Sequence, residues 1–308
     1  MSTVMKRIAW GLALIGLVVV GDRVIARGLQ KVVLSTENRF AVLYRGGVPD
    51  DAVLIFGDSR SVDSFHAPSL SEGLGRPVFN LGNNGTSISI IEILLEDYLE
   101  RNGKPSLVVI EASCVRQSHE QIQDLLPFAT TSDRVGLFAD RVLPDDLVRA
   151  RQVSDLYNFN GETLVRAIGT FGKSDQGYAP GKRISAQALA EAQGDYVDTI
   201  NLRPENLDAL ERLTAMLRSE GIEYRLVIAP YLPAYRPKIE NFDAFVRAVS
   251  EAADAPVWDF SNALTQTDAF ADRVHPNRTG ARLLVPILIE RGLFEPGGAP
   301  LATGPSDG

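Results

Sequence analysis

The sequence runs Val53-Leu-Ile-Phe-Gly-Asp-Ser-Arg60 where its first strand is expected. The four apolar, partly β-branched residues are typical of a strand buried on both faces of a sheet. Gly57 permits a tight turn, and the Asp58 and Ser59 side chains can hydrogen-bond the backbone that follows. A serine on such a turn is held out of the carboxyl edge of the sheet, where a substrate reaches it. The alternative is that Asp58 and Ser59 only cap the next helix.

Short apolar strands and helices also alternate beyond this turn. Further strands are predicted at 77–81, 105–111, 224–229 and 256–260, and helices at 88–101, 204–220, 239–253 and up to about 291. Strands that alternate with helices form a parallel sheet with helices on both faces. We therefore predict an α/β protein, a three-layer α/β/α sandwich with a parallel sheet of about five strands.

An apolar N-terminal run precedes this domain. Residues 8–21 follow Lys6 and Arg7, and the apolar pattern continues at roughly helical spacing to Leu34. A helix that spans a membrane needs about 17 residues or more, so this run is short for one. Its length matches the apolar core of a signal peptide. We predict a signal anchor and amphipathic helix over 1–35 that tethers the protein to a membrane, with the following domain outside the cytoplasm. A cleaved signal peptide and a buried soluble helix are the alternatives.

Three segments lie outside the alternation. Residues 37–51 are predicted to be a polar connector, at the start of a catalytic domain that extends over 36–295. Residues 117–200 combine helical patches with glycine-rich loops, which is typical of a lid or substrate-facing insertion, with a peripheral helical cover as the alternative. Residues 296–308 are rich in Gly, Pro and Ala without periodicity, which predicts a disordered tail.

Composition excludes several classes of function. The 308 residues carry a formal net charge of -8, and the pI is about 5.1. This balance argues against binding to nucleic acid, which usually requires a basic face. Cys114 is the only cysteine, so no internal disulfide and no cysteine-based metal site can form.

A serine nucleophile needs a base, because its hydroxyl is poorly nucleophilic at neutral pH. The three histidines of the chain are His66, His119 and His275. His275 lies in a loop before the last predicted helix and follows Asp272 by three positions. A carboxylate at that spacing can fix the imidazole tautomer and stabilise the imidazolium that forms on proton uptake. The candidate catalytic residues are therefore Ser59, His275 and Asp272.

Acyl chemistry also needs hydrogen-bond donors aimed at the developing oxyanion. The backbone N–H groups of Ser59 and Gly82 are candidates, because glycine allows a close approach of the backbone. Asn83 and Asn84 could each add a side-chain amide. The alternative is that this run is an ordinary Asn-Gly turn.

Three blocks of the sequence resemble those of the SGNH (GDSL-type) hydrolase superfamily. Gly57-Asp58-Ser59 resembles the first block, Asn80-Leu-Gly82-Asn-Asn-Gly85-Thr86 the second, and Asp272-Arg-Val-His275 the last. They occur in the order found in the family, after the first, second and last predicted strands. The resemblance implies an SGNH/flavodoxin-like fold with Ser59 as nucleophile, His275 as base, Asp272 as its orienting partner and Gly82 as an oxyanion donor.

The chain departs from this family at the third block, G-x-N-D, which supplies an asparagine to the oxyanion hole. Glu111-Ala-Ser-Cys-Val115 stands at that place. The missing donor could be replaced by Asn83, Asn84, Arg60 or Arg116. Alternatively, the site favours transfer or binding over fast hydrolysis.

With this departure and its N-terminal helix, the chain is similar to membrane-anchored SGNH-like proteins of bacterial cell envelopes. These include the alginate acetylation proteins and the D-alanyl transfer protein of teichoic acid synthesis, and several act beside a membrane-bound O-acyltransferase. The resemblance implies a serine ester hydrolase or O-acyltransferase that acts on O-acyl groups of cell-envelope glycans and needs no metal or organic cofactor. The alternatives are a non-catalytic glycan-binding or assembly protein with a degenerate site, and a lipid esterase.

Three further side chains are candidates for binding the substrate, namely Arg60, Arg116 and Tyr231. Arg60 could bind an anionic group, with an ion pair to Asp63 as the alternative. Tyr231 and Tyr235 follow the fourth predicted strand and could line an acceptor cleft, with core packing as the alternative.

Overall fold

The computed structural model describes residues 2–117, 122–159, 164–165, 168–172, 176–177 and 179–300. The chain forms two compact units. The sheet unit combines Gly46–Gln121 with Asp175–Gly308, and the helical unit combines Met1–Arg45 with Ile122–Ser174. Part of the predicted insertion thus clusters with the N-terminal helix and not with the sheet. Of the predicted disordered tail, residues 301–308 lie outside the described residues.

Five parallel strands form the sheet, in the order β2-β1-β3-β4-β5. They are β1 (Val53–Phe56), β2 (Val78–Asn80), β3 (Leu107–Glu111), β4 (Tyr224–Ile228) and β5 (Val257–Asp259). This is the strand order of flavodoxin-like sheets. The predicted parallel sheet of about five strands is confirmed.

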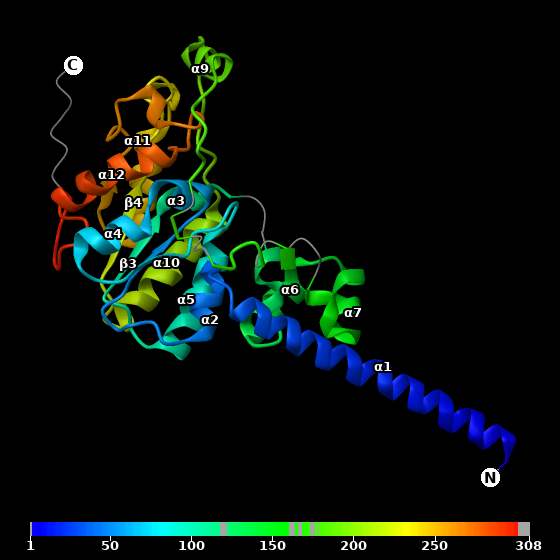
Figure 1. Ribbon diagram of the computed structural model, residues 1–308. Coiled ribbons are helices and arrows are strands. Elements are labelled where there is room, and N and C mark those ends of the chain that lie inside the picture. Colours follow the sequence, from blue (N-terminus) through cyan, green and yellow to red (C-terminus); the bar gives the residue numbers. More distant parts are fainter. Residues whose placement is uncertain are drawn as a thin grey trace. The chain divides into compact units, whose positions relative to one another are not determined.

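Helices cover both faces of the sheet and complete the predicted three-layer α/β/α sandwich (Figure 1). One layer contains α3 (Ser59–Ser64), α4 (Ala67–Leu74) and α12 (Arg278–Glu290), and the other contains α5 (Ile88–Asn102), α10 (Pro204–Ser219) and α11 (Phe242–Ala253). Shorter elements of the same unit are η1 (Ala112–Arg116), α9 (Ala186–Gln193), η4 (Arg236–Lys238) and η5 (Thr267–Ala269).

The central strands are buried because both faces of the sheet are covered. Every residue of β1 and of β3 is buried. The pairing sets Ile55 opposite Asn80 on β2 and opposite Val109 on β3. Burying one such aliphatic side chain contributes about 1.5–3 kcal/mol to stability. The loops at the carboxyl ends of these strands are therefore attached to a well-packed support.

The direction of the chain through the sheet reverses at β1. From β1 the chain passes to β2 on one side, and it later forms β3 on the other side. The loops after β1 and β3 therefore diverge at the carboxyl edge, and this is where open α/β sheets bind their ligands. Ser59 directly follows β1 and its turn, and Glu111 is the last residue of β3.

The helical unit begins with a long apolar helix. Its elements are α1 (Thr3–Leu34), α2 (Arg39–Arg45), η2 (Gln123–Phe128), α6 (Asp133–Val142), α7 (Asp145–Val153) and η3 (Asp155–Asn158). The most apolar part of α1 has a mean hydropathy of 2.0. By length and composition, α1 fits a membrane anchor or a signal sequence.

The segment predicted as a polar connector contains α2. Phe40, Leu43 and Tyr44 are buried there, and the Tyr44 ring stacks on Phe128 with 4.4 Å between ring centroids. The prediction of a connector at 37–51 is therefore wrong for this helix, because its apolar side chains pack into the helical unit.

Asp22 joins α1 to the following helices of the same unit. Its carboxylate accepts hydrogen bonds from the Ser154 hydroxyl, from the Asp155 N–H at 2.8 Å and from the Leu156 N–H at 3.4 Å. Arg23 Nη1 also lies 2.6 Å from Asp155 Oδ1. The second half of α1 is thus part of the fold of this unit.

Candidate active site

The turn after β1 requires glycine at its first position. Gly57 has a φ of 151°. A Cβ atom at this position would lie 2.7 Å from Ser61 Cβ and 2.8 Å from Glu111 Cβ, which is closer than such atoms approach. Glycine alone lets the backbone leave β1 between these two side chains.

The next two residues, Asp58 and Ser59, have different roles. Asp58 is the N-cap of α3, and its Oδ1 accepts a hydrogen bond from the Arg60 N–H at 2.9 Å. Ser59 is the first residue of α3 and is half-buried. Because Asp58 supplies the cap, the Ser59 hydroxyl does not have to serve that purpose.

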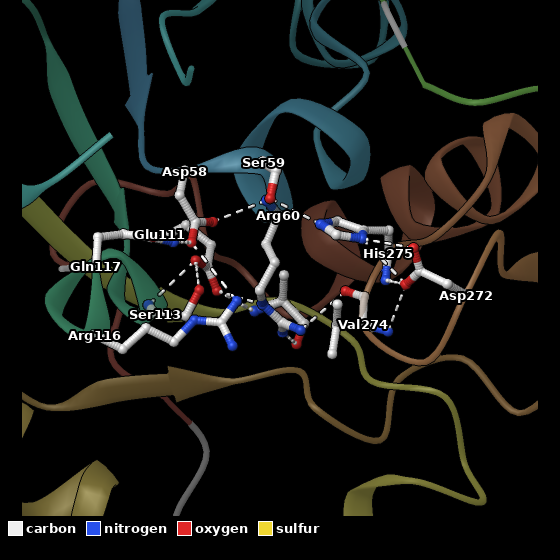
Figure 2. A network of polar contacts seen from close by, with 11 residues as sticks. Asp58, Ser59, Arg60, Glu111, Ser113, Arg116, Gln117, Asp272, Val274 and His275 are labelled. Carbon is white, nitrogen blue, oxygen red and sulfur yellow. Dashed lines mark hydrogen bonds and ion pairs between the residues drawn. The ribbon is translucent and has the colours of Figure 1, made fainter. Parts of the chain in front are cut away.

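Ser59, His275 and Asp272 lie in a hydrogen-bonded row, which we call the reactive trio. Ser59 Oγ is 2.8 Å from His275 Nε2. His275 Nδ1 is 2.9 Å from Asp272 Oδ2 and 3.1 Å from Asp272 Oδ1. Figure 2 shows the imidazole between the hydroxyl and the carboxylate. The structure thus brings together the side chains of Ser59 and His275, which are 216 positions apart in the sequence.

The loop that carries His275 is fixed by its own carboxylate. Asp272 Oδ1 accepts hydrogen bonds from the Val274 N–H at 2.9 Å and the His275 N–H at 3.0 Å. Burial alone would raise the pKa of Asp272, but the hydrogen bonds from the His275 side chain and from these two N–H groups outweigh it and lower the pKa. The carboxylate therefore stays ionised and is able to stabilise an imidazolium on His275.

Arg60 lies beneath the trio and is completely buried, with 0% of its surface exposed. Its Nη1 donates a hydrogen bond to the Val274 carbonyl at 3.0 Å, its Nη2 donates to the Ala229 carbonyl, and its Nε lies 3.3 Å from Glu111 Oε1. The residue after the candidate nucleophile is thus bonded to the residue before the candidate base (Figure 2).

The position of Arg60 corrects the prediction that it binds substrate. An anionic group of a substrate cannot reach a guanidinium that is fully enclosed and already bonded on all sides to the protein. Its carboxylate partner is Glu111, with which it forms what we call the buried pair. The physical reason is that a buried arginine needs both a counter-charge and hydrogen-bond acceptors.

Glu111 is a residue whose part in the site was not predicted from the sequence. Its carboxylate also accepts hydrogen bonds from the Ser113 N–H at 3.2 Å, from the Ser113 hydroxyl and from the Ala229 N–H at 3.2 Å. Burial raises the pKa of Glu111, although the charge of Arg60 opposes this rise. The signal in the sequence is an acidic residue that ends a wholly apolar strand, together with an arginine next to the serine.

Asp58 is buried and has partners from the loop after β3. Gln117 Nε2 donates a hydrogen bond to Asp58 Oδ2, and Arg116 Nη2 lies 3.7 Å from the same oxygen. The Arg116 side chain is 27% exposed. Arg116 is therefore the predicted substrate-binding arginine that remains accessible from solvent.

The predicted oxyanion donors are differently placed. Gly82 N–H donates to Asn80 Oδ1 at 3.0 Å, and Asn83 N–H donates to the Gly57 carbonyl at 3.0 Å. Asn83 is half-buried, and Asn84 is exposed. The Ser59 N–H belongs to the first turn of α3, where N–H groups have no acceptor within the helix. Their oxyanion roles stay predictions.

Asn80 holds this second block in place from the interior. Its Nδ2 donates hydrogen bonds to the Ser61 and Phe65 carbonyls, both at 2.9 Å. A Cβ atom at Gly82 would lie 2.7 Å from Ser61 Oγ. The block therefore packs tightly against α3, the helix that begins with Ser59.

A polar cleft of about 390 Å³ lies beside the trio. Arg116, Tyr231, Tyr235, Arg273 and Val274 are among the residues that line it. The predicted substrate-binding residue Tyr231 is only 1% exposed, and the Arg60 guanidinium lies over its ring at 3.6 Å from the centroid. The structure therefore places Tyr231 in the wall of the cleft, largely covered by other side chains.

A second serine–histidine contact occurs in the same unit and differs in its surroundings. His66 caps α4, its Nδ1 accepting a hydrogen bond from the Ser69 N–H at 3.2 Å and lying 2.9 Å from Ser69 Oγ. Burial, with the charges of Arg282 and Arg278, lowers the pKa of His66. This contact fits a structural cap, and it provides a matched control for the Ser59–His275 contact.

Comparisons with known proteins give a fold likeness at low identity. No family model and no curated protein matches the chain. It is similar to the solved structures of the acetyl xylan esterase AlAXEase (12% identity, TM-score 0.39, 78% of this chain and 98% of that chain), TesA (15%, 0.37, 78% and 96%) and a GDSL-like lipase from Bacteroides thetaiotaomicron (12%, 0.37, 82% and 92%). The last carries the name of the superfamily that the motifs resemble. With identities and TM-scores this low, conclusions about the reaction depend on the geometry of the site.

Proposed function

We propose that the protein is a serine ester hydrolase with Ser59 as its nucleophile. The observation that supports this most directly is the contact of Ser59 Oγ with His275 Nε2 at 2.8 Å, with Asp272 Oδ2 2.9 Å from Nδ1 of the same ring. A hydroxyl, an imidazole and a carboxylate in this order form the arrangement that activates serine in acyl transfer.

The proposed reaction has two halves. Ser59 Oγ attacks the acyl carbonyl carbon while His275 Nε2 takes the hydroxyl proton, and Asp272 stabilises the resulting imidazolium. The tetrahedral intermediate then expels the alcohol, which receives that proton from His275, and leaves an acyl-serine. A water molecule or an acceptor hydroxyl, deprotonated by His275, attacks the acyl-serine and releases Ser59.

We propose O-acyl groups of cell-envelope glycans as the substrates, with hydrolysis or transfer to a sugar hydroxyl as the outcome. Support comes from the motif resemblance and from α1, which fits a membrane anchor or signal sequence. On this proposal α1 tethers the sheet unit outside the bacterial cytoplasm, and a membrane-bound O-acyltransferase is the expected partner. Protease digestion of intact spheroplasts tests the orientation, because an extracytoplasmic sheet unit would be degraded.

A fluorophosphonate probe tests the nucleophile. The wild-type protein should be labelled on Ser59 and should hydrolyse p-nitrophenyl acetate. Ser59→Ala should abolish labelling and lower hydrolysis by at least about 1,000-fold. The matched control is Ser69→Ala, which removes the serine in contact with His66 and should leave labelling intact. A wild-type protein that is neither labelled nor active would overturn the proposal.

The alternative of a non-catalytic glycan-binding protein makes a different prediction. Such a protein would bind an acetylated glycan and leave the fluorophosphonate probe unreacted. Product analysis with O-acetylated glycan separates the two enzymatic outcomes, because hydrolysis releases acetate and transfer moves the acetyl group to an added acceptor sugar.

A further inference from the structure

The polar cleft beside the trio contains two arginine side chains that have few partners. Arg116 Nη2 is 3.7 Å from Asp58, and Arg273 Nη1 is 3.9 Å from Asp198. Both distances exceed that of a hydrogen bond. Arg273 also contacts the Tyr196 side chain and lies over the Tyr235 ring, 5.0 Å from its centroid. A guanidinium has five N–H groups, so both arginines keep N–H groups that a ligand could use.

Two parts of the cleft lining neighbour residues of the reactive site. Arg116 contacts the carboxylate of Asp58, which precedes Ser59 in sequence. Arg273 and Val274 line the same cleft and directly precede His275. The cleft lining therefore includes the two residues that separate Asp272 from His275.

Tyr231 adds an independent indication that a ligand binds here. It lines the cleft and is 1% exposed, and among the described residues its hydroxyl has no hydrogen-bond partner. A buried hydroxyl without a partner is unfavourable, so a ligand that offered it an acceptor would be bound more tightly. Burial raises the pKa of Tyr231, so the hydroxyl keeps its proton and can act as a donor.

The charges of the cleft favour a monoanion. The lining itself includes two arginines, Arg116 and Arg273, and one carboxylate, Asp198, which leaves one positive charge in excess, while the buried Asp58 carboxylate lies 3.7 Å from Arg116 outside the lining. This local excess contrasts with the net charge of -8 of the whole chain. Guanidinium groups form paired hydrogen bonds with carboxylates. The volume of about 390 Å³ lies within the range of small-molecule sites.

We infer that this cleft is a carboxylate subsite, in which Arg116 and Arg273 hold a carboxylate on the alcohol part of the ester that Ser59 cleaves. The inference depends on the proposed function and narrows its substrates to acyl esters of acidic sugars. The carboxylate is a binding group and takes no part in the chemical steps.

A pair of matched esters tests the subsite. Mono-O-acetylated methyl glucuronide and mono-O-acetylated methyl glucoside differ only in the carboxylate. For the wild-type protein, kcat/KM should be about 10- to 100-fold higher for the glucuronide, the range expected for hydrogen bonds to a charged group. Arg273→Gln should reduce this ratio towards one, mainly by raising KM for the glucuronide.

A matched control is available at the surface of the sheet unit. Arg183 Nη2 lies 3.6 Å from Asp268, a similarly long ion pair away from the cleft lining. Arg183→Gln should leave the ratio at its wild-type value. Arg116→Gln is a second test of the subsite. Because Arg116 faces the buried Asp58, its folding is checked by thermal unfolding, and Arg273→Gln, with 53% of its side chain exposed, stays the principal variant.

Binding without turnover separates failure of the subsite from failure of the proposed function. In the Ser59→Ala protein, methyl glucuronide should bind detectably more tightly than methyl glucoside in calorimetry, and adding Arg273→Gln should weaken it about 10-fold. A wild-type protein that hydrolyses both esters with equal kcat/KM would overturn the subsite and leave the ester hydrolase standing. A protein that binds the glucuronide but hydrolyses neither ester would retain the subsite and refute the proposed function.

Discussion

The reactive trio and the buried pair each have one member at the start of α3, Ser59 and Arg60, and they differ in exposure. In the trio, the His275 and Asp272 side chains are 21% and 43% exposed. In the pair, the Arg60 and Glu111 side chains are both 0% exposed. Ser59 and Arg60 are adjacent in sequence, so a single step along α3 separates the two environments.

This difference indicates two tasks. A group that exchanges a proton with substrate must stay accessible, and the trio meets this condition. A guanidinium enclosed by Glu111 and two carbonyl groups has no such access, and its hydrogen bonds to the Ala229 and Val274 carbonyls join the ends of two loops. We therefore expect loss of the trio to affect catalysis first, and loss of the pair to affect stability first.

Asp272→Asn is expected to separate the loss of catalysis from the loss of stability most clearly. The amide removes the charge that stabilises the imidazolium, and ester hydrolysis should fall by up to about 10,000-fold, as in other triads. Fluorophosphonate labelling should slow in parallel, while the midpoint of denaturant unfolding at pH 7 changes little. A variant of normal activity would show that His275 works without its carboxylate.

The buried pair should show the opposite pattern. Arg60→Met leaves Glu111 buried without a counter-charge and should cost about 3–5 kcal/mol of the free energy of unfolding. Glu111→Gln should destabilise similarly, and the double variant should lose less than the sum of the two, by about 0.5–3 kcal/mol. Urea unfolding of all four proteins measures this coupling.

The catalytic rate of the Arg60→Met protein that remains folded provides a second measurement. Loss of the Val274 contact should displace His275, and misplacement by about 1 Å lowers rates by about 100-fold. If Arg60→Met is as stable and as active as wild type, the role assigned to the buried pair is wrong.

A smaller effect is expected at Asn277, which supports the His275 loop from the interior. Its Oδ1 caps α12 by accepting from the Thr279 and Gly280 N–H groups at 3.0 and 3.1 Å, and its Nδ2 donates to the Asp268 carbonyl at 2.7 Å. Asn277→Ala should cost about 1 kcal/mol or somewhat more. Asn277→Asp keeps the capping oxygen but removes the Nδ2 donor, so comparing it with Asn277→Ala separates the cap from the contact with the Asp268 carbonyl. An Asn277→Ala protein as stable as wild type would contradict both roles.

The smallest expected effect is the pH dependence of the free energy of unfolding. The pKa of Asp272 is lower in the folded protein than the about 3.9 of an unfolded chain. Its contribution to stability is therefore fully present above the unfolded value and is lost as the pH falls through the folded value. The difference in unfolding free energy between wild type and Asp272→Asn should be constant near neutral pH and shrink below about pH 4. A difference that grows in acid would contradict this sign.

The fold was largely predictable from local patterns. Short β-branched runs such as 53–56 alternate with amphipathic helices, and that alternation determines a parallel sheet covered on both faces. The segment of α2 was missed because its apolar run, residues 40–44, is short and lies between Arg39 and Arg45, and the partner of Tyr44, the Phe128 side chain, comes much later in the chain.

The site was predictable where chemistry limits the choice of residue. A serine at a turn and one histidine with a nearby aspartate suffice to name Ser59, His275 and Asp272, and the structure places them in contact. The role predicted for Arg60 was wrong because its acceptors come from three distant segments, at Glu111, Ala229 and Val274. No spacing in the sequence reveals whether a charged side chain beside a nucleophile points outwards or into the core.

The carboxylate of Asp22 has a practical consequence for anyone who shortens this protein. Deleting the whole N-terminal helix to improve solubility would also delete the acceptor for Ser154, Asp155 and Leu156, and three donors of the helical unit would lose their partner together. A soluble version that begins just before Asp22 keeps that acceptor and removes the most apolar turns of α1. The choice of first residue thus decides whether a purified sample retains an intact helical unit.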